Sequence, residues 1–215
     1  MGIVIAIDGP AGAGKSTIAR LLASRLQYTY IDTGAMYRSI ALLAGRQGVS
    51  MEDAARLEAL AAAAEIELLP EGRVCLNGED ITDSIRTPEV SAGASKVAAI
   101  GGVRVALVAR QRQIAERRNV VMEGRDIGTV VFPNARVKVF LDADPGERVR
   151  RRQGDLPSTV SAEELAAQLA ERDARDRGRA ESPLVQAQDA VYLNSTGLTP
   201  DEVIEKILEI VRREK

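Results

Sequence analysis

The sequence lacks the side chains that the commonest enzyme chemistries require. It contains no histidine and a single cysteine, Cys75. These counts exclude a Ser-His-Asp triad, an HExxH zinc site, a zinc finger and an intramolecular disulfide. Any general base must therefore be a carboxylate, a lysine, a tyrosine or the substrate itself. We expect Cys75 to be a small apolar side chain.

An excess of charge of one sign and a long apolar run are also missing. The chain has 29 basic and 31 acidic residues and a net charge of -2, so no general affinity for nucleic acid is expected. The apolar start at residues 2–7 is too short for a signal peptide. No uncharged apolar stretch reaches membrane-spanning length. We therefore predict a cytoplasmic protein that binds neither membranes nor nucleic acid.

The 215 residues, 45% of them hydrophobic, are enough for one globular domain with a real core. Short, apolar, β-branched runs alternate with segments that have helical spacing of apolar residues. This alternation predicts an α/β fold, a parallel sheet with helices on both faces. The expected strands are residues 2–8, 29–32, 119–123, 137–143 and 190–194.

Local signals mark helix starts and two interruptions of the alternation. Helix N-caps or capping boxes are expected at Ser50, Asp144, Ser161 and Thr199. Residues 65–82 are typical of a small antiparallel insertion with an Asn77-Gly78 turn. Residues 148–179 contain eight arginines and a break at 154–158, which indicates a charged, hinged flap.

Residues 9–16, GPAGAGKS, match the phosphate-loop pattern GxxxxGK(S/T) between an expected strand and an expected helix. In such a loop the backbone N–H groups converge on an anion at a helix N-terminus. Lys15 would reach the β- and γ-phosphates, and the Ser16 hydroxyl can ligate Mg²⁺. The pattern therefore predicts nucleoside triphosphate binding. It leaves GTPases, motor ATPases and small-molecule kinases open, although an NKxD guanine motif is absent.

Three further segments carry charged residues that could contribute to a binding site. They are IDTGAMYR at 31–38, EGRDIGT at 123–129 and ERDARDRGR at 171–179. Taken singly, each also fits a plain structural role: a capped helix with a surface arginine, a surface ion pair and a solvated helix face. Because parallel sheets bind ligands beyond the carboxyl ends of their strands, Arg125 and Asp126 should face the same cleft as the phosphate loop.

In this order the four motifs resemble those of bacterial cytidylate kinases, a family of the nucleoside monophosphate kinase superfamily, from residue 3 to about 210. The resemblance implies transfer of the ATP γ-phosphoryl group to CMP or dCMP, with Mg²⁺ as cofactor. It also implies a monomer with a P-loop NTPase fold: a five-stranded parallel sheet, a small antiparallel β insertion and a helical lid.

The resemblance further divides the single domain, 1–215, into three regions. The core would comprise residues 1–32, 106–147 and 180–215. The monophosphate-binding region with its β insertion would span 33–105, and the lid with its following helix 148–179.

Residue roles carried over from the resemblance fall into groups. The ATP-binding residues would be Gly9, Pro10, Ala11, Gly12, Ala13, Gly14, Lys15, Ser16 and Thr17, with Ser16 as the metal ligand. The cytosine pocket would be lined by Thr33, Ser95, Arg104 and Asp126. The α-phosphate would be held by Arg38, Arg125 and Arg179, and the ribose by Arg172 and Asp176. The catalytic residues would be Lys15, Arg125 and Arg179.

Some points stay open at this stage. Ser95 lies in a segment without an independent signal and could be a helical surface serine. Lid contacts to ATP could come from Arg148, Arg151 or Arg152, and Asn194 stands where many relatives have aspartate. A kinase for another small acceptor and an ATP-dependent switch protein are the alternative functions.

Overall fold

The computed structural model describes residues 2–154 and 160–213 and confirms the α/β class. Its main sheet has the order β2-β6-β1-β7-β8, and every neighbouring pair is parallel. All five predicted strands form, with small shifts at their ends. They are β1 (Val4–Asp8), β2 (Thr29–Asp32), β6 (Val120–Gly124), β7 (Val137–Asp142) and β8 (Val191–Asn194).

The two central strands bring the chemistry-bearing motifs to one edge of the sheet. Every residue of β1 and of β6 is buried, as expected for β-branched strands covered on both faces. The pairing runs from Val4 opposite Val120 to Asp8 opposite Gly124. The phosphate loop after β1 and the Arg125-Asp126 segment after β6 therefore leave the sheet side by side.

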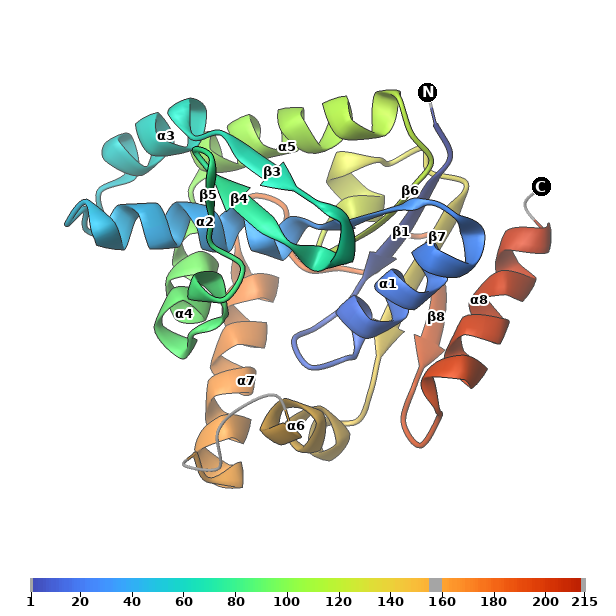
Figure 1. Ribbon diagram of the computed structural model, residues 1–215. Helices are drawn as coiled ribbons and strands as arrows, with labels where there is room; N and C mark the ends of the chain where they lie inside the picture. The colour runs from blue at the N-terminus through green and yellow to red at the C-terminus, as the bar shows by residue number, and fades with distance from the viewer. Residues whose placement is uncertain (1, 155–159, 214–215) are drawn as a thin grey trace.

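Helices cover both faces of the sheet (Figure 1). On one face, α1 (Lys15–Leu26) and α8 (Pro200–Arg213) bury Ile18, Leu22, Ile204 and Ile207 against it. On the other face, α5 (Gly101–Glu116) packs with the π-helical turn Ile127–Val131. Below the carboxyl edge lie the helices of the predicted lid, α6 (Pro145–Gly154) and α7 (Ala162–Gly178).

The predicted antiparallel insertion is confirmed as a three-stranded sheet in the order β3-β4-β5. The left-handed φ angles of Asn77 and Gly78, 50° and 82°, form the tight turn expected between two strands. The insertion shares a second hydrophobic core with helices of the region predicted to bind the monophosphate. Its elements are α2 (Thr33–Arg46), α3 (Ala54–Ala63), β3 (Ile66–Leu68), β4 (Val74–Leu76), β5 (Glu79–Asp80) and α4 (Pro88–Val97).

The predicted helix starts are confirmed with one exception. Ser161 and Glu164 form a full capping box on α7, and Thr199 exchanges bonds with Glu202 at the start of α8. Asp144 directly precedes α6. The prediction for Ser50 is wrong, because α3 begins at Ala54 and its N-cap is Asp53, which accepts from the Arg56 N–H.

The ends of the predicted regions differ from the ends of the helices. The boundary at residue 105 falls inside α5, and the boundary at residue 147 falls inside α6. Residues 155–158 of the predicted hinge lie outside the described residues. Both lid helices nevertheless pack together, which keeps the lid one structural unit on the carboxyl side of the sheet.

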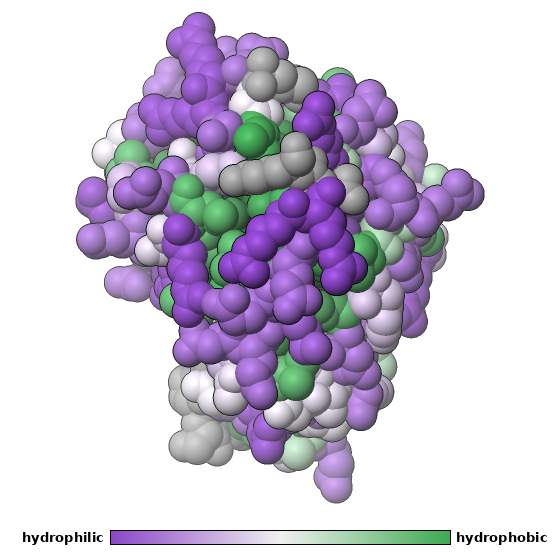
Figure 2. Space-filling model, turned by 90° about the vertical axis from the view of Figure 1, so that its right-hand side faces the viewer, coloured by the Kyte–Doolittle hydropathy of each residue, from purple (hydrophilic) through white to green (hydrophobic). Residues whose placement is uncertain are grey.

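The α8 side of the molecule is largely hydrophilic, and hydrophobic groups show only in gaps between polar side chains (Figure 2). In the described ranges no single helix is long and apolar enough to cross a membrane. The bent pair α4 and α5 passes that test only when both helices are counted together.

Candidate active site

The phosphate loop turns sharply between β1 and α1. Gly12 and Gly14 have φ angles of 76° and 88°, a conformation that side-chain-bearing residues rarely adopt. A Cβ on Gly12 would lie 3.0 Å from the backbone oxygen of Arg148. Glycine at these positions therefore allows both the turn and the close approach of the lid.

Lys15, the first residue of α1, is buried in the cleft. Its Nζ donates to the Pro10 carbonyl at 2.6 Å, which folds the side chain back over the loop. Burial, and next the nearby Arg125 guanidinium, lower the pKa of Lys15. A phosphate group bound in the loop would supply the negative charge that favours the ammonium form.

The end of β2 and the start of α2 form one wall of the cleft. Asp32 caps α2 by accepting from the Ala35 N–H at 2.9 Å, and it pairs with Arg38 at 2.8 Å. The Thr33 hydroxyl donates to the Glu123 carbonyl at 2.7 Å, which joins this wall to β6. The same aspartate thus sets the helix start and the orientation of Arg38.

The end of β6 places a carboxylate and two ion pairs in the cleft. Burial, and next the nearby Asp32, raise the pKa of Glu123, which accepts from the Tyr30 hydroxyl. Arg125 donates to Asp176 at 2.9 Å. The following residue, Asp126, pairs with Arg104 of α5 in a buried contact.

The Arg104-Asp126 pair lies over a ring and against α4. The guanidinium of Arg104 sits 5.6 Å from the ring centre of Tyr37, a cation–π distance. The Ala98 carbonyl, at the end of α4, accepts from both Arg104 and Arg179, at 3.2 and 3.4 Å. Ser95, one turn earlier, is buried rather than on the surface, and its hydroxyl has no partner among the described residues.

The lid helices are bonded to the phosphate loop. Arg148 of α6 donates to the Ala11 carbonyl at 3.1 Å and pairs with Asp173 of α7. Asp173 also accepts from the Ala11 N–H at 3.2 Å. Arg151 donates to the Ala13 carbonyl at 3.1 Å and to Ser195. Arg148 and Arg151, which were predicted as candidate lid contacts, therefore both bond the phosphate loop.

These walls enclose a single cavity of about 510 Å³, a size typical of small-ligand sites. Its lining includes every predicted acceptor-side residue: Thr33, Arg38, Ser95, Arg104, Arg125, Asp126, Arg172, Asp176 and Arg179. The phosphate-loop residues from Ala11 to Thr17 line the same cavity, whereas Gly9 and Pro10 do not. Gly9 packs instead against Leu141 of β7, so its place is below the loop.

Several residues of this site carry no predicted role. Tyr37, Asp32 and Glu123 stand inside the quoted motifs and line the cavity. Asp173 stands in the third motif and reaches the phosphate loop. Asp8 is buried under the segment after β6 and accepts from its backbone. A carboxylate at the carboxyl end of a buried strand is the signal that could have indicated Asp8.

The sequence and the fold are similar to those of known proteins. A sequence profile described as cytidylate kinase matches residues 5–213. A cytidylate kinase of Solibacter usitatus is 64% identical over 215 residues, covering 98% of this chain and 92% of that protein. One of Geobacter sulfurreducens is 50% identical over 217 residues, covering 98% and 93%. A sugar kinase structure from a Janibacter species has a similar fold, with a TM-score of 0.52, 14% identity and coverage of 99% and 95%.

Proposed function

Because the chain belongs to the cytidylate kinase family, we propose that it transfers the γ-phosphoryl group of ATP to the α-phosphate of CMP or dCMP. The products are ADP and CDP or dCDP, and the reaction belongs to pyrimidine nucleotide metabolism. The observation that carries the proposal is the buried Arg104-Asp126 pair, which lines the same cavity as the phosphate loop.

Asp126 and Arg104 read the cytosine ring in this proposal. The carboxylate accepts from the cytosine N4 amino group, and the guanidinium donates to the acceptor edge of the ring. Uracil presents an oxygen to that carboxylate, and a buried acceptor without a donor costs about 1–3 kcal/mol. The partnerless hydroxyl of Ser95 and the hydroxyl of Thr33 supply further polar contacts to the base.

Three arginines hold the acceptor phosphate. Arg38, Arg125 and Arg179 enter the cavity from α2, from the segment after β6 and from the end of α7. Arg172 and Asp176, one helical turn apart on α7, address the ribose. Burial, and next the nearby Arg125, lower the pKa of Arg172 to about 10. A cation buried among other cations favours a bound anion.

The absence of histidine is consistent with this chemistry. A phosphate monoester has its second pKa near about 6, so the attacking oxygen of CMP is mostly ionised at neutral pH. Catalysis then needs positioning and charge neutralisation rather than a base. Lys15 of the phosphate loop supplies charge on the donor side, and Arg125 and Arg179 supply it on the acceptor side.

The donor set fits Mg²⁺, which takes few protein ligands and otherwise binds phosphate oxygens and water. The Ser16 hydroxyl lines the cavity and interacts with the buried Glu123 carboxylate, and Asp32 lies on the same wall. Ser16 is the proposed protein ligand. When bound, the ion neutralises charge on the β- and γ-phosphates.

Lid closure over both substrates completes the proposal. The lid arginines Arg148 and Arg151 bond the phosphate loop, which places α6 next to the proposed ATP site. Covering the site keeps water from accepting the phosphoryl group. We further propose that the protein acts as a cytoplasmic monomer without nucleic-acid partners.

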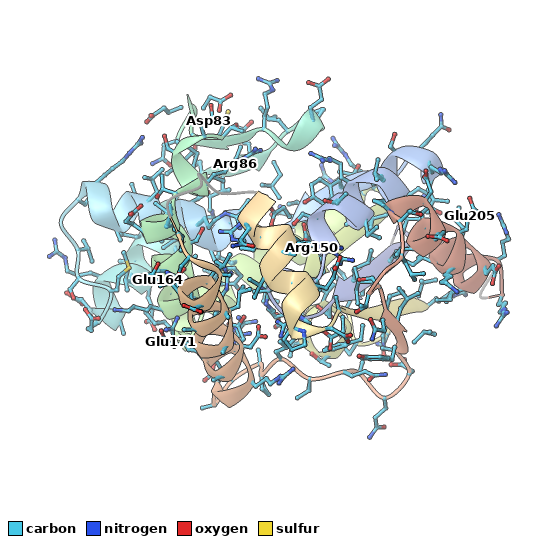
Figure 3. The ribbon with its side chains drawn as sticks, turned by 90° about the horizontal axis from the view of Figure 1, so that it is seen from below. Asp83, Arg86, Arg150, Glu164, Glu171 and Glu205 are labelled. Atoms are coloured by element: carbon cyan, nitrogen blue, oxygen red, sulfur yellow. The ribbon has the colours of Figure 1, made fainter. Side chains whose placement is uncertain are left out.

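The test is substitution of Asp126. Asp126→Asn places an amide opposite the N4 amino group, so kcat/KM should fall about 10- to 100-fold for CMP and much less for UMP. Steady-state kinetics with both acceptors gives the ratio. Asp83→Asn, an exposed carboxylate before the short helix Ser84–Arg86, is the matched control (Figure 3). A CMP/UMP ratio that Asp126→Asn leaves unchanged would contradict the assignment.

A further inference from the structure

Asp8, the last residue of β1, lies under the acceptor-reading segment. Its carboxylate is 6% exposed. One oxygen accepts from the Ile127 N–H at 2.8 Å, and the other accepts from the Gly128 N–H at 2.7 Å. These are the first two N–H groups of the π-helical turn Ile127–Val131, 119 and 120 residues away in sequence. A single carboxylate therefore satisfies two N–H groups that a helical start leaves without partners.

Asp126 occupies the N-cap position of the same turn. Aspartate at an N-cap normally accepts from the first free N–H groups of its own helix. Asp126 makes no such bond, and its carboxylate pairs with Arg104 instead. Its φ and ψ angles of -146° and 25° leave the backbone in place for the turn while the side chain faces the cavity.

We propose that Asp8 is a positioning residue for acceptor selection: it caps the turn in place of Asp126 and so keeps the Asp126 carboxylate available for the base. Asp8 bonds the first N–H groups of the turn, and Asp126 pairs with Arg104 in the cavity. The inference rests on the proposed role of Asp126 in reading cytosine. Asp8 itself does not line the cavity and has no contact with substrate in this account.

The position of Asp8 also links the two halves of the reaction. Its backbone continues directly into Gly9 and the phosphate loop, whereas its side chain holds the turn that carries Arg125 and Asp126. The register of β1 with β6 sets the same spacing through the sheet, with Asp8 opposite Gly124. Asp8 thus fixes the acceptor-reading turn relative to the donor loop.

Close packing around the π-helical turn leaves little space for it to move. A Cβ on Gly128 would lie 3.1 Å from Cδ of Lys138 and 3.4 Å from the Asp8 carboxylate. Lys138 cannot easily retreat, because its Nζ is bonded to Asp189 at 2.6 Å and to the Pro133 carbonyl. Small changes at this contact should therefore shift the turn and the Asp126 side chain with it.

The experiment is Asp8→Asn, which keeps the size of the side chain and sets an amide NH₂ against one of the two N–H groups. The CMP/UMP ratio of kcat/KM should fall about tenfold, and the KM for ATP should change less than about twofold. A residue that served only stability would lower activity with both acceptors equally. A ratio unchanged in a folded Asp8→Asn protein overturns the inference.

Two further variants separate the possible failures. In the Asp126→Asn background, Asp8→Asn should lower the ratio by less than about twofold more, because it acts through the residue already removed. An additive loss overturns the inference. If Asp126→Asn alone leaves the ratio unchanged, the proposed function has failed instead.

Gly128→Ala reaches the same contact without altering Asp8 and covers the case in which Asp8→Asn does not fold. The added methyl group should move the turn and lower the CMP/UMP ratio about threefold, with the KM for ATP again little changed. A folded Gly128→Ala protein with an unaltered ratio counts against the inference. Circular dichroism establishes folding for each variant, and Asp83→Asn is the control for the loss of one carboxylate.

Discussion

The side chains that line the cleft carry more positive than negative charge. Its lining has eight basic side chains against five acidic ones. Burial lowers the pKa of Lys15 and of Arg172, and it raises the pKa of Glu123. Such environments favour a ligand that brings anionic oxygens into the cleft. Two nucleotides bound with their phosphates facing each other would bring such oxygens.

Asp8 should show a measurable dependence of stability on pH. Burial raises its pKa from 3.8 to about 6. The folded state therefore binds the carboxyl proton of Asp8 more tightly than the unfolded state does. For this reason Asp8 contributes stability at low pH, and the contribution is lost as pH rises through about 6. The free energy of unfolding of the unaltered protein, relative to Asp8→Asn, should therefore rise by about 1 kcal/mol from about pH 7 to about pH 5.

Urea unfolding of both proteins at the two pH values provides this difference, since other groups titrate alike in each. A relative stability that stays constant or falls on acidification would contradict the raised pKa. The measurement is independent of the acceptor-selectivity test of Asp8.

The sequence could predict which residues enter the cleft but not what orients them. Arg125 and Asp126 follow a buried strand, so the rule for parallel sheets places them beside the phosphate loop. The burial of Ser95 depends on how α4 packs, and its segment carries no signal of that. The bond from Ile127 to Asp8 joins positions 119 residues apart, which no local pattern reveals.

Among the elements, the lid depends on two kinds of contact with the phosphate loop. Leu165 and Leu169 of α7 form a small apolar cluster with Ala11. Beside it, Asp173 joins the Ala11 N–H to Arg148, so one carboxylate connects the loop with both lid helices. These contacts hold α6 and α7 against the phosphate loop.

Asp173→Asn should weaken this connection. It leaves the largely buried Arg148 guanidinium without its carboxylate partner. The lid should then hold ATP less firmly, and the KM for ATP should rise about tenfold, or about 1.4 kcal/mol, with a smaller change for CMP. Glu171→Gln is the matched control, because Glu171 lies on the exposed face of the same helix and pairs with Arg175 of that helix (Figure 3). Equal effects of the two substitutions on the KM for ATP would refute the lid connection.

Helix boundaries show where local chemistry is sufficient. Ser161 and Thr199 are followed at the third position by glutamate, and both capping boxes form. Ser50 lacks that partner, and its hydroxyl bonds Glu52 within a turn while Asp53 starts the helix. Asp53 caps the helix instead, because its carboxylate accepts from the Arg56 N–H in the first turn of α3.

At the scale of the whole molecule, strand order brings the proposed donor and acceptor sites together. β1 lies between β6 and β7, and β6 lies between β1 and β2, so three functional segments leave neighbouring strands at one edge. The monophosphate-binding region adds its own hydrophobic core beside the sheet. The helices α6 and α7 lie below the carboxyl edge of the sheet (Figure 1), and residues of both line the cavity.

Much of this arrangement follows from the sequence pattern. Alternating buried strands and helices predict a parallel sheet, and Asn77-Gly78 predicts the insertion turn; both are confirmed. The positions of Gly9 and Pro10 outside the cavity depend on how the loop begins beneath its anion site. The phosphate-loop pattern covers all of residues 9–16, so it does not distinguish residues that line the cavity from residues that support the turn.

The most direct test of the account is ADP formation from MgATP by the unaltered protein with CMP, dCMP, UMP, AMP, dTMP and shikimate, each beside a sample without acceptor. The account predicts rates with CMP and dCMP at least about tenfold above those with the other acceptors, as expected from the cost of an unpaired buried acceptor. It also predicts almost no ADP without acceptor, because the lid excludes water. Equal or faster turnover with another acceptor, or ADP formation that needs no acceptor, would contradict it.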